Sequence, residues 1–312
     1  MSARLSEEYN PVMGVDRGVR VWRHAHGVLD LNTPRVMAIV NLTPDSFFDG
    51  GHLMPEESDA PNLSVATKRA HGLRERGADI LDLGGESTRP GAAAVSSEVE
   101  LRRVLPVLMR LVASERAGPI SVDTRRAAVA RRVVDAGAAI INDISGLADP
   151  EMATVVAESG AGLVISHLRG DPATMQHKID FCDLFAEITD ELGEMVAAAL
   201  RAGVCRSQIV VDPGIGFGKD AEQSAALVVG AADIEAATGC PVLIGASRKS
   251  FLGALTGLPL EERREASVVA AVASIQAGAA LVRVHDVGPT VDALRLLASL
   301  DAAYARAREV SA

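Results

Sequence analysis

Eight short apolar runs recur along the chain, and most are followed by a polar cluster and then by a longer stretch with helical spacing. A continuous apolar run bounded by turn residues is typical of a strand that is buried on both faces. The predicted strands cover residues 36–40, 80–83, 119–122, 139–141, 162–165, 209–211, 242–244 and 280–284. The predicted helices cover residues 63–76, 97–115, 125–136, 150–159, 184–202, 224–238 with a break near Gly230, 262–277 and 291–306.

Strands that alternate with helices indicate parallel pairing through right-handed crossovers. Eight such units in about 250 residues is the usual size of a (β/α)₈ TIM barrel, an α/β fold. A doubly wound sheet is the competing interpretation, but it would show fewer strands and one dominant ligand crevice. Because nearly every predicted strand ends in a polar cluster, we favour the barrel. Either fold would gather these clusters at one face.

The N-terminal region carries a different pattern. Residues 18–32 alternate around a central His-Gly pair, which predicts a small β-hairpin over one end of the domain. Residues 1–17 show no periodicity. We therefore expect a flexible N-terminal segment, followed by a single domain over residues 18–312.

Composition narrows the class of protein. Hydrophobic residues make up 48% of the chain and aromatic residues only 3%, which predicts a core of Ala, Val, Leu and Ile. The net charge is −10 and no long Lys/Arg run occurs, so we expect no nucleic-acid partner. No apolar run is long enough to cross a bilayer, so we expect no membrane association. Cys182, Cys205 and Cys240 lack metal-ligand spacing and are interpreted as reduced thiols of a cytoplasmic protein.

The segment from residue 78 to residue 91 reads ADILDLGGESTRPG. Its apolar strand contains Asp82, a carboxylate that must find hydrogen-bond donors if it is buried. The glycines after the strand allow close approach of the backbone to a ligand, and Pro90 favours an extended conformation at Arg89. This pattern predicts a stiff loop that presents Thr88 and Arg89 beyond the C-terminal end of the strand, where barrels carry their chemistry.

The other strand ends supply two chemical groups. Asp123, Asn142 and Asp212 offer acceptors and one amide, a set that suits a fused heterocycle with an amino group and ring N–H groups. The residues that suit a phosphate or pyrophosphate are Arg89, Arg283 and His285. Lys249 is able to serve either group. Asn41 offers an oxygen ligand for a hard cation such as Mg²⁺.

Simpler interpretations exist for single residues. Asp123, taken alone, is placed to cap the following helix as well as it is placed to bind a ligand. His285, taken alone, is more often a structural histidine. Lys219 follows a glycine-rich run, but neither a phosphate-binding loop nor a dinucleotide fingerprint has this glycine spacing.

Seven motifs in order closely resemble those of the dihydropteroate synthase family. They are NLTPDSFFDGG at 41–51, GGESTRPG at 84–91, SVDT at 121–124, NDISG at 142–146, DPGIGFGK at 212–219, SRKS at 247–250 and RVHD at 283–286. The resemblance implies a barrel enzyme that joins 4-aminobenzoate to 6-hydroxymethyl-7,8-dihydropterin diphosphate, with release of pyrophosphate and 7,8-dihydropteroate. It also implies a homodimer and a Mg²⁺ cofactor.

The resemblance assigns roles by motif. The residues implied to hold the pterin are Asp123, Asn142, Asp212 and Lys249. Arg283 is implied to stack on the pterin and to bind the diphosphate with His285 and Arg89, and Asn41 to reach Mg²⁺. The residues implied to border the aminobenzoate pocket are Phe47, Thr88, Pro90, Phe217 and Ser247. In this interpretation the residues that act in catalysis are Asp123, Lys249, Arg283 and His285.

Two other functions fit parts of this pattern. A methyltransferase that acts on methyltetrahydrofolate with a cobalamin partner would share the barrel and the pterin-holding carboxylates. It would have no use for the Arg283-Val-His group or for Thr88 and Arg89. The other is a paralogue that binds a pterin or another protein but has lost turnover, and its only support is the altered first loop, where Phe48 stands in place of a small residue that is common in the family.

Overall fold

The computed structural model describes residues 20–43, 60–87, 94–114, 116–170, 175 and 180–309. The predicted flexible segment 1–17 lies outside the described residues. So do residues 44–59 and 88–93, which include four of the predicted site residues.

The strands of the main sheet are all parallel and follow the order β8-β7-β6-β5-β4-β3-β10-β9. Their bounds are β3 (Arg35–Asn41), β4 (Ile80–Gly84), β5 (Ile120–Asp123), β6 (Ile140–Asp143), β7 (Gly162–Ser166), β8 (Ile209–Asp212), β9 (Leu243–Ile244) and β10 (Leu281–Val284). A parallel bridge between Val211 and Val242 connects the two ends of the sheet. The sheet therefore closes into the predicted (β/α)₈ barrel, and the doubly wound alternative is wrong.

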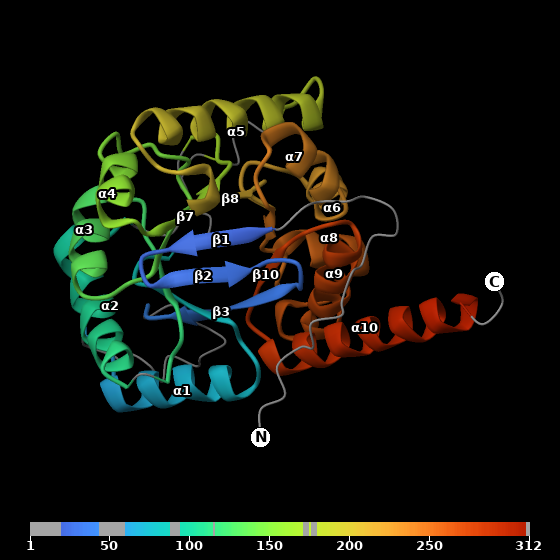
Figure 1. Cartoon of the computed structure of the whole chain (residues 1–312), viewed down its shortest axis with the longest axis horizontal. Coiled ribbons are helices and arrows are strands. Elements are labelled where there is room, and N and C mark those ends of the chain that lie inside the picture. Colours follow the sequence, from blue (N-terminus) through green and yellow to red (C-terminus); the bar gives the residue numbers. More distant parts are fainter. Residues whose placement is uncertain are drawn as a thin grey trace.

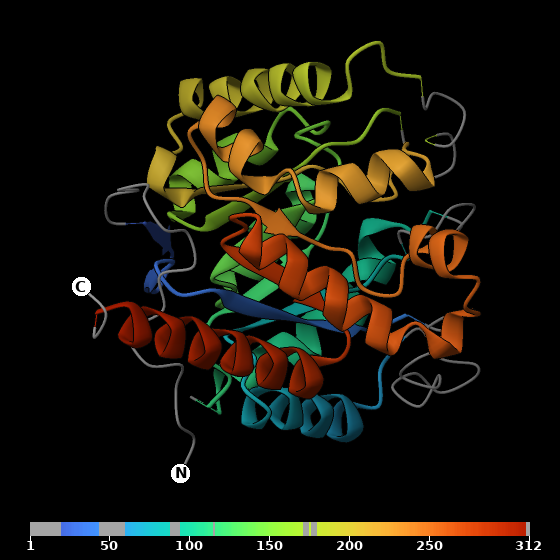
Figure 2. The same ribbon diagram turned by 90° about the vertical axis from the view of Figure 1, so that its right-hand side faces the viewer.

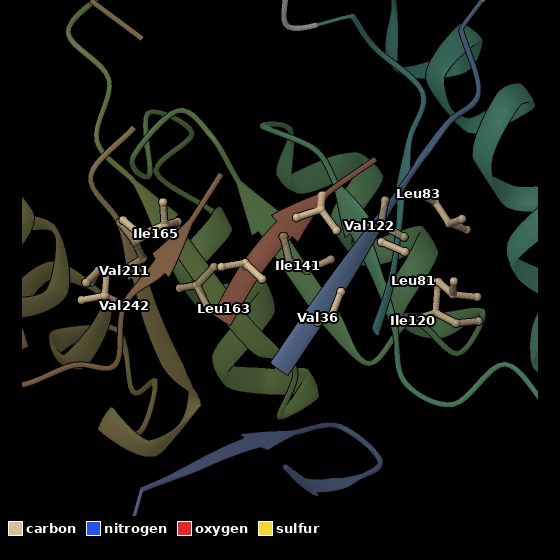
Figure 3. Close-up of a cluster of buried hydrophobic side chains, with 14 of the residues drawn as sticks. Val36, Leu81, Leu83, Ile120, Val122, Ile141, Leu163, Ile165, Val211 and Val242 are labelled. Atoms are coloured by element: carbon tan, nitrogen blue, oxygen red, sulfur yellow. The ribbon is translucent and has the colours of Figure 1, made fainter. Parts of the chain in front are cut away.

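The helices surround the strands (Figure 1). Their bounds are α1 (Leu63–Glu75), α2 (Ser97–Val112), α3 (Ala127–Asp135), α4 (Met152–Ser159), α5 (Leu184–Arg201), α6 (Ala221–Val228), α7 (Ala231–Thr238), α8 (Ser250–Thr256), α9 (Arg264–Gln276) and α10 (Val287–Glu309). Figure 3 shows apolar strand residues such as Val36, Leu81 and Ile141, which belong to the cluster between the strands and this outer layer.

The helices differ from the sequence-based expectation at three places. The predicted helix 224–238 is two helices, α6 and α7, that meet at Gly230, as the expected break indicated. Helix α8 was not predicted, because its seven residues are too short for a clear helical period. Helix α10 begins at Val287 rather than at residue 291, because Pro289 is tolerated in the first turn of a helix.

The predicted hairpin is present as antiparallel β1 (Val21–His24) and β2 (Gly27–Asp30), and Figure 1 shows it across one end of the barrel. Trp22 is fully buried, and its indole N–H donates to the backbone oxygen of Gln208 at 2.8 Å. Trp22 packs in one apolar cluster with residues from the starts of the barrel strands. These include Met37, Ile80, Ile140, Val164, Val210, Leu243 and Leu281. The hairpin therefore closes the end of the barrel where the strands begin.

Strand alternation explains what lies above this cluster. Successive side chains of a strand point to opposite faces, so every second residue points into the barrel. On β4 the inward position after Ile80 is Asp82, and on β10 the inward position after Leu281 is Arg283. An apolar layer at the hairpin end thus gives way to a polar layer toward the strand ends. Figure 2 shows the hairpin and the far ends of the strands on opposite sides of the molecule.

Candidate active site

The polar layer centres on Arg283, which lies between two carboxylates from other strands. Its Nε donates to Asp82 Oδ2 at 2.6 Å, and its Nη2 donates to Asp123 Oδ2 at 2.8 Å. Asn142 Nδ2 donates to the same oxygen of Asp82 at 3.1 Å. Asp82 is fully buried, and its Oδ2 has therefore found the donors that the sequence required, whereas no described residue donates to its buried Oδ1.

Burial raises the pKa of Asp123, while the Arg283 guanidinium opposes this rise and Asp82 adds to it. Two carboxyl groups thus lie around one guanidinium, and the raised pKa shows that the charge of Asp123 is not fully compensated by Arg283. Positive charge on a ring bound beside them would favour the ionised form of Asp123 and would in turn be stabilised by it.

A second cluster contains Asp212 and Lys249. Burial raises the pKa of Asp212, and Lys249 opposes this rise. Burial lowers the pKa of Lys249 to about 8. Gly245 lies beside both side chains, because a Cβ there would be 3.7 Å from Asp212 Oδ2 and 3.9 Å from Lys249 Nζ. A side chain at this position would therefore be in van der Waals contact with both the carboxylate and the ammonium.

The glycine-rich segment after β8 holds Lys249 in place. Lys249 Nζ donates to the backbone oxygen of Ile215 and lies 4.3 Å from the centre of the Phe217 ring. Asp212 Oδ1 accepts from the N–H of Gly214 at 2.7 Å, which fixes the start of the same segment. This segment therefore links the carboxylate, the lysine and the aromatic ring.

The segment after β9 meets the end of β10 through side-chain hydrogen bonds. Ser247 Oγ lies 3.0 Å from His285 Nδ1 and accepts from the N–H of His285 at 3.2 Å. Arg248 donates to both oxygens of Asp286, at 2.8 and 2.7 Å. These contacts bring Ser247 and His285 to the same rim as Arg283.

A cavity of about 450 Å³ opens above the polar layer. The predicted site residues that line it are Asn41, Asp123, Phe217, Ser247, Lys249, Arg283 and His285. Asp212 and Asn142 lie close to these residues but do not line it. Among the described residues, no group of three or more His, Cys, Asp or Glu side chains is placed to hold a metal ion. A metal here would need ligands from substrate or water beside the amide of Asn41.

The comparison with known proteins agrees with this geometry. Residues 37–285 match the family described as pterin binding enzyme. The dihydropteroate synthase of Escherichia coli (strain K12) is 42% identical over 269 residues, which are 86% of this chain and 92% of that protein. The chain belongs to the dihydropteroate synthase family of pterin binding enzymes.

Solved structures of the family support this assignment. The Xanthomonas albilineans dihydropteroate synthase with 4-aminobenzoic acid has a TM-score of 0.82 and 42% identity, over 91% of this chain and 99% of that chain. The Burkholderia cenocepacia dihydropteroate synthase complexed with 7,8-dihydropteroate has a TM-score of 0.82 and 38% identity, over 92% of this chain and 99% of that chain.

Four predicted site residues of this family member lie outside the described residues, namely Phe47, Thr88, Arg89 and Pro90. The described residues on either side of 88–93 are joined through Glu86 and Arg126. Arg126 Nη2 donates to Glu86 Oε1 at 2.9 Å and to the backbone oxygen of Val95 at 2.6 Å. Burial alone would raise the pKa of Glu86, but hydrogen bonds from Arg125 and Arg126 lower it to about 2. Sequence reasoning missed this cluster, because it took Arg125 as the start of a helix.

Sequence reasoning also missed a cluster beside the glycine-rich segment. Lys219 Nζ donates to the backbone oxygen of Phe217 at 2.9 Å and lies 2.9 Å from His167 Nδ1. His167 Nε2 lies 3.0 Å from Glu191 Oε2 on α5. Lys219 is almost fully buried, and it is not among the residues that line the cavity. It therefore contacts the segment that carries Phe217 on the side that faces away from the cavity. The only signal for this role was the lysine after the glycine run, which matched no phosphate-binding loop.

Proposed function

We propose that the chain acts as a dihydropteroate synthase. The reaction joins 6-hydroxymethyl-7,8-dihydropterin diphosphate to 4-aminobenzoate and releases pyrophosphate and 7,8-dihydropteroate. The observation that carries this proposal is the Asp82–Arg283–Asp123 arrangement below one cavity, with Lys249 and His285 on its wall. The ligands of the two solved relatives, 4-aminobenzoic acid and 7,8-dihydropteroate, support the same substrate and product.

The pterin is the natural partner of the lower part of the site. Its amino group and ring N–H groups require acceptors, and the carboxylates of Asp123 and Asp212 supply them. Asn142 donates to Asp82 through Nδ2, which leaves its amide oxygen available as an acceptor. Lys249 is held at the edge of this region by Ile215 and Phe217, where its ammonium is able to donate to a ring carbonyl or nitrogen.

The diphosphate is the natural partner of the cationic rim. Departure of pyrophosphate develops negative charge on the leaving oxygen, and fixed cations aimed at that position lower the barrier. Arg283 and His285 supply this stabilisation among the described residues, and we propose that Arg89 adds to it. Asn41 would hold Mg²⁺, since one amide oxygen suits an ion that otherwise keeps waters and substrate phosphates as ligands. When bound, Mg²⁺ would neutralise charge on the diphosphate.

The remaining step needs little acid or base chemistry. Loss of pyrophosphate leaves an electron-poor methylene carbon on the pterin, and the Asp123 carboxylate stabilises positive charge shared with the ring. The aniline nitrogen of 4-aminobenzoate is already nucleophilic and attacks this carbon. The C–O bond to the diphosphate breaks, the C–N bond forms, and the amine releases one proton. No covalent enzyme intermediate is required.

Pyrophosphate release tests the proposal directly. Purified protein is incubated with both substrates and Mg²⁺, and pyrophosphate and 7,8-dihydropteroate are measured together. We expect equal amounts of the two products, and we expect a chelator of divalent cations to stop their formation. Pterin diphosphate binding in calorimetry without product would instead identify a paralogue that has lost turnover. Methyl transfer from methyltetrahydrofolate to a corrinoid would identify the alternative methyltransferase.

The assembly and location of the protein belong to the same proposal. We propose a homodimer formed through α9 and α10, which lie side by side in Figure 2. Large apolar residues on these helices are exposed, including Val269 at 68% and Leu296 at 60%. We also propose a cytoplasmic location, because Cys182, Cys205 and Cys240 are all free thiols. Every helix within the described ranges is too short or too polar to traverse a bilayer.

A further inference from the structure

Lys219 does not line the cavity, but it ends the glycine-rich segment that forms part of the cavity wall. This segment begins after Asp212 at the end of β8. Three of its glycines, Gly214, Gly216 and Gly218, have positive φ values of 71°, 75° and 63°. Because glycine restricts the backbone less than any other residue, this segment depends on contacts with other residues to keep one conformation.

Side chains fix the segment at three points. Asp212 binds its start, and Ser224 Oγ accepts from the N–H of Gly216 at 3.2 Å. Lys219 Nζ donates to the backbone oxygen of Phe217 at 2.9 Å. The lysine therefore fixes the part of the segment that carries the aromatic ring.

A chain of hydrogen bonds fixes Lys219 in turn. His167 is fully buried, and burial and the charge of Lys219 lower its pKa to about 4, so its ring is neutral with one proton. Burial acts to raise the pKa of Glu191, but a hydrogen bond from Arg169 lowers it below its ordinary value, so Glu191 is ionised and only accepts. The ring proton of His167 therefore lies on Nε2, 3.0 Å from Glu191 Oε2, and Nδ1 accepts from Lys219 at 2.9 Å.

The same segment holds Lys249 on its cavity side. The backbone oxygen of Ile215 accepts from Lys249 Nζ, and the centre of the Phe217 ring lies 4.3 Å from that nitrogen. Ile215 and Phe217 lie between the points that Asp212 and Lys219 fix. A shift of the segment would therefore move the ammonium of Lys249, which lines the cavity.

We propose that Lys219 is a positioning residue, which fixes the glycine-rich segment and thereby places the Lys249 ammonium for the pterin. The inference rests on the proposed function and concerns a residue that touches no substrate. A displacement of about 1 Å, caused by a change outside the reacting groups, is able to cost about a hundredfold in activity. Lys219 should therefore affect pterin binding through Lys249.

A double-mutant cycle tests this dependence. Calorimetry in the presence of Mg²⁺ measures Kd for 6-hydroxymethyl-7,8-dihydropterin diphosphate in the unaltered protein, Lys219→Met, Lys249→Met and the double variant, each shown to be folded by urea denaturation. We expect Lys219→Met alone to raise Kd by about tenfold. In the Lys249→Met background the same change should raise it by less than about threefold, because a residue that acts through another is not additive with it. Lys68→Met, at an exposed position of α1, is the matched control and should leave Kd unchanged.

Two variants of His167 test the chain that fixes the lysine. His167→Leu removes the acceptor of Lys219 and should raise Kd by about tenfold. His167→Asn keeps an acceptor oxygen close to the position of Nδ1, so Kd should rise by no more than about threefold. Equal effects of the two substitutions would show that the hydrogen bond to Lys219 does not matter, and would overturn the proposal.

Two results of the cycle would also overturn it. An unchanged Kd in folded Lys219→Met would show that the segment keeps its position without the lysine. A tenfold effect in both backgrounds would show that Lys219 acts independently of Lys249. Binding does not require turnover, so absence of product from an unaltered protein that binds the pterin diphosphate would reject the proposed function alone, and the two failures are distinguishable.

Discussion

The guanidinium of Arg283 donates a 2.8 Å hydrogen bond to the carboxylate of Asp123, a residue 160 positions earlier in the chain. The same guanidinium binds Asp82 at 2.6 Å. The cation assigned to the leaving diphosphate and the carboxylate assigned to the pterin are thus one hydrogen-bonded unit. A change in either residue should therefore alter both substrate subsites.

Replacement of Arg283 should affect stability and turnover together. Arg283→Ala leaves Asp82 and Asp123 buried without their cation, and loss of one partner of a buried pair costs about 3–5 kcal/mol of unfolding free energy. It also removes a cation from the diphosphate site, so turnover should fall by about a hundredfold or more. Urea denaturation and pyrophosphate release measure the two effects. Arg131→Ala, which breaks the exposed pair with Glu158, is the control and should change neither. Near-normal kinetics in Arg283→Ala would contradict the assigned role.

Lys219 should make stability depend on pH. Burial lowers its pKa from 10.5 to about 7, although Asp212 acts in the opposite direction. The unfolded chain therefore holds this proton between about pH 7 and the ordinary pKa, while the folded protein has released it. The free energy of unfolding should therefore rise with pH between about pH 7 and the ordinary pKa. Below about pH 7 the folded protein carries the buried charged ammonium, and the full loss of stability from that charge should be present. In the unaltered protein this rise in unfolding free energy should amount to about 2–3 kcal/mol between about pH 7 and about pH 9. In Lys219→Met we expect the rise to disappear.

Urea denaturation of both proteins across this pH range measures the effect. Lys68→Met, at an exposed position of α1, is the matched control and should leave the pH dependence unchanged. A parallel pH dependence in Lys219→Met and the unaltered protein would mean that Lys219 stays charged in the fold.

The hairpin should contribute stability without contributing to chemistry. Trp22→Ala removes a fully buried indole from the end of the barrel where the strands begin, which should cost about 3–5 kcal/mol. The site lies at the opposite end, so kcat of the remaining folded protein should be unchanged. Val28→Ala, on the same hairpin but 53% exposed, should change the unfolding free energy by no more than about 0.5 kcal/mol. A large fall in kcat at a temperature where Trp22→Ala is folded would refute this separation.

The exposed apolar face of α10 should hold the proposed dimer together. Leu296→Glu combined with Leu300→Glu places two charges on this face, which desolvation in an interface would penalise strongly. We expect sedimentation to show a dimer for the unaltered protein and a monomer for this variant. Met109→Glu, on the exposed side of α2, should remain a dimer. A monomeric unaltered protein at micromolar concentration would refute the assembly.

The sequence was most informative where the periodicity of apolar residues and the parallel arrangement of the strands determine the structure. Short apolar runs alternating with helical segments predicted the barrel, and the parallel strands brought Asp123, Asp212 and Arg283 to one end because their carboxyl ends share one edge. The buried Asp82 signalled a requirement for donors. These inferences depend on backbone geometry that every parallel strand shares.

The sequence was less informative about hydrogen bonds between side chains that are far apart along the chain. Neither the bond from Arg283 to Asp123 nor the clamp of Arg126 on Glu86 follows from a local pattern. Each depends on rotamers and on space left by other strands. Helix α8 was missed because seven residues carry too little periodicity. The roles of Phe47, Thr88, Arg89 and Pro90 stay predictions from family motifs.

The closure of the barrel at β9 has a further consequence. This strand has two residues, and an isolated bridge joins Val211 of β8 to Val242, the residue just before β9. The cylinder therefore has a seam with few backbone hydrogen bonds, and local opening is cheapest where such bonds are fewest. Gly245, Ser247 and Lys249 follow directly from this seam. The wall that carries them therefore follows a strand with only two residues paired to β10, whereas β3 and β4 pair over five residues.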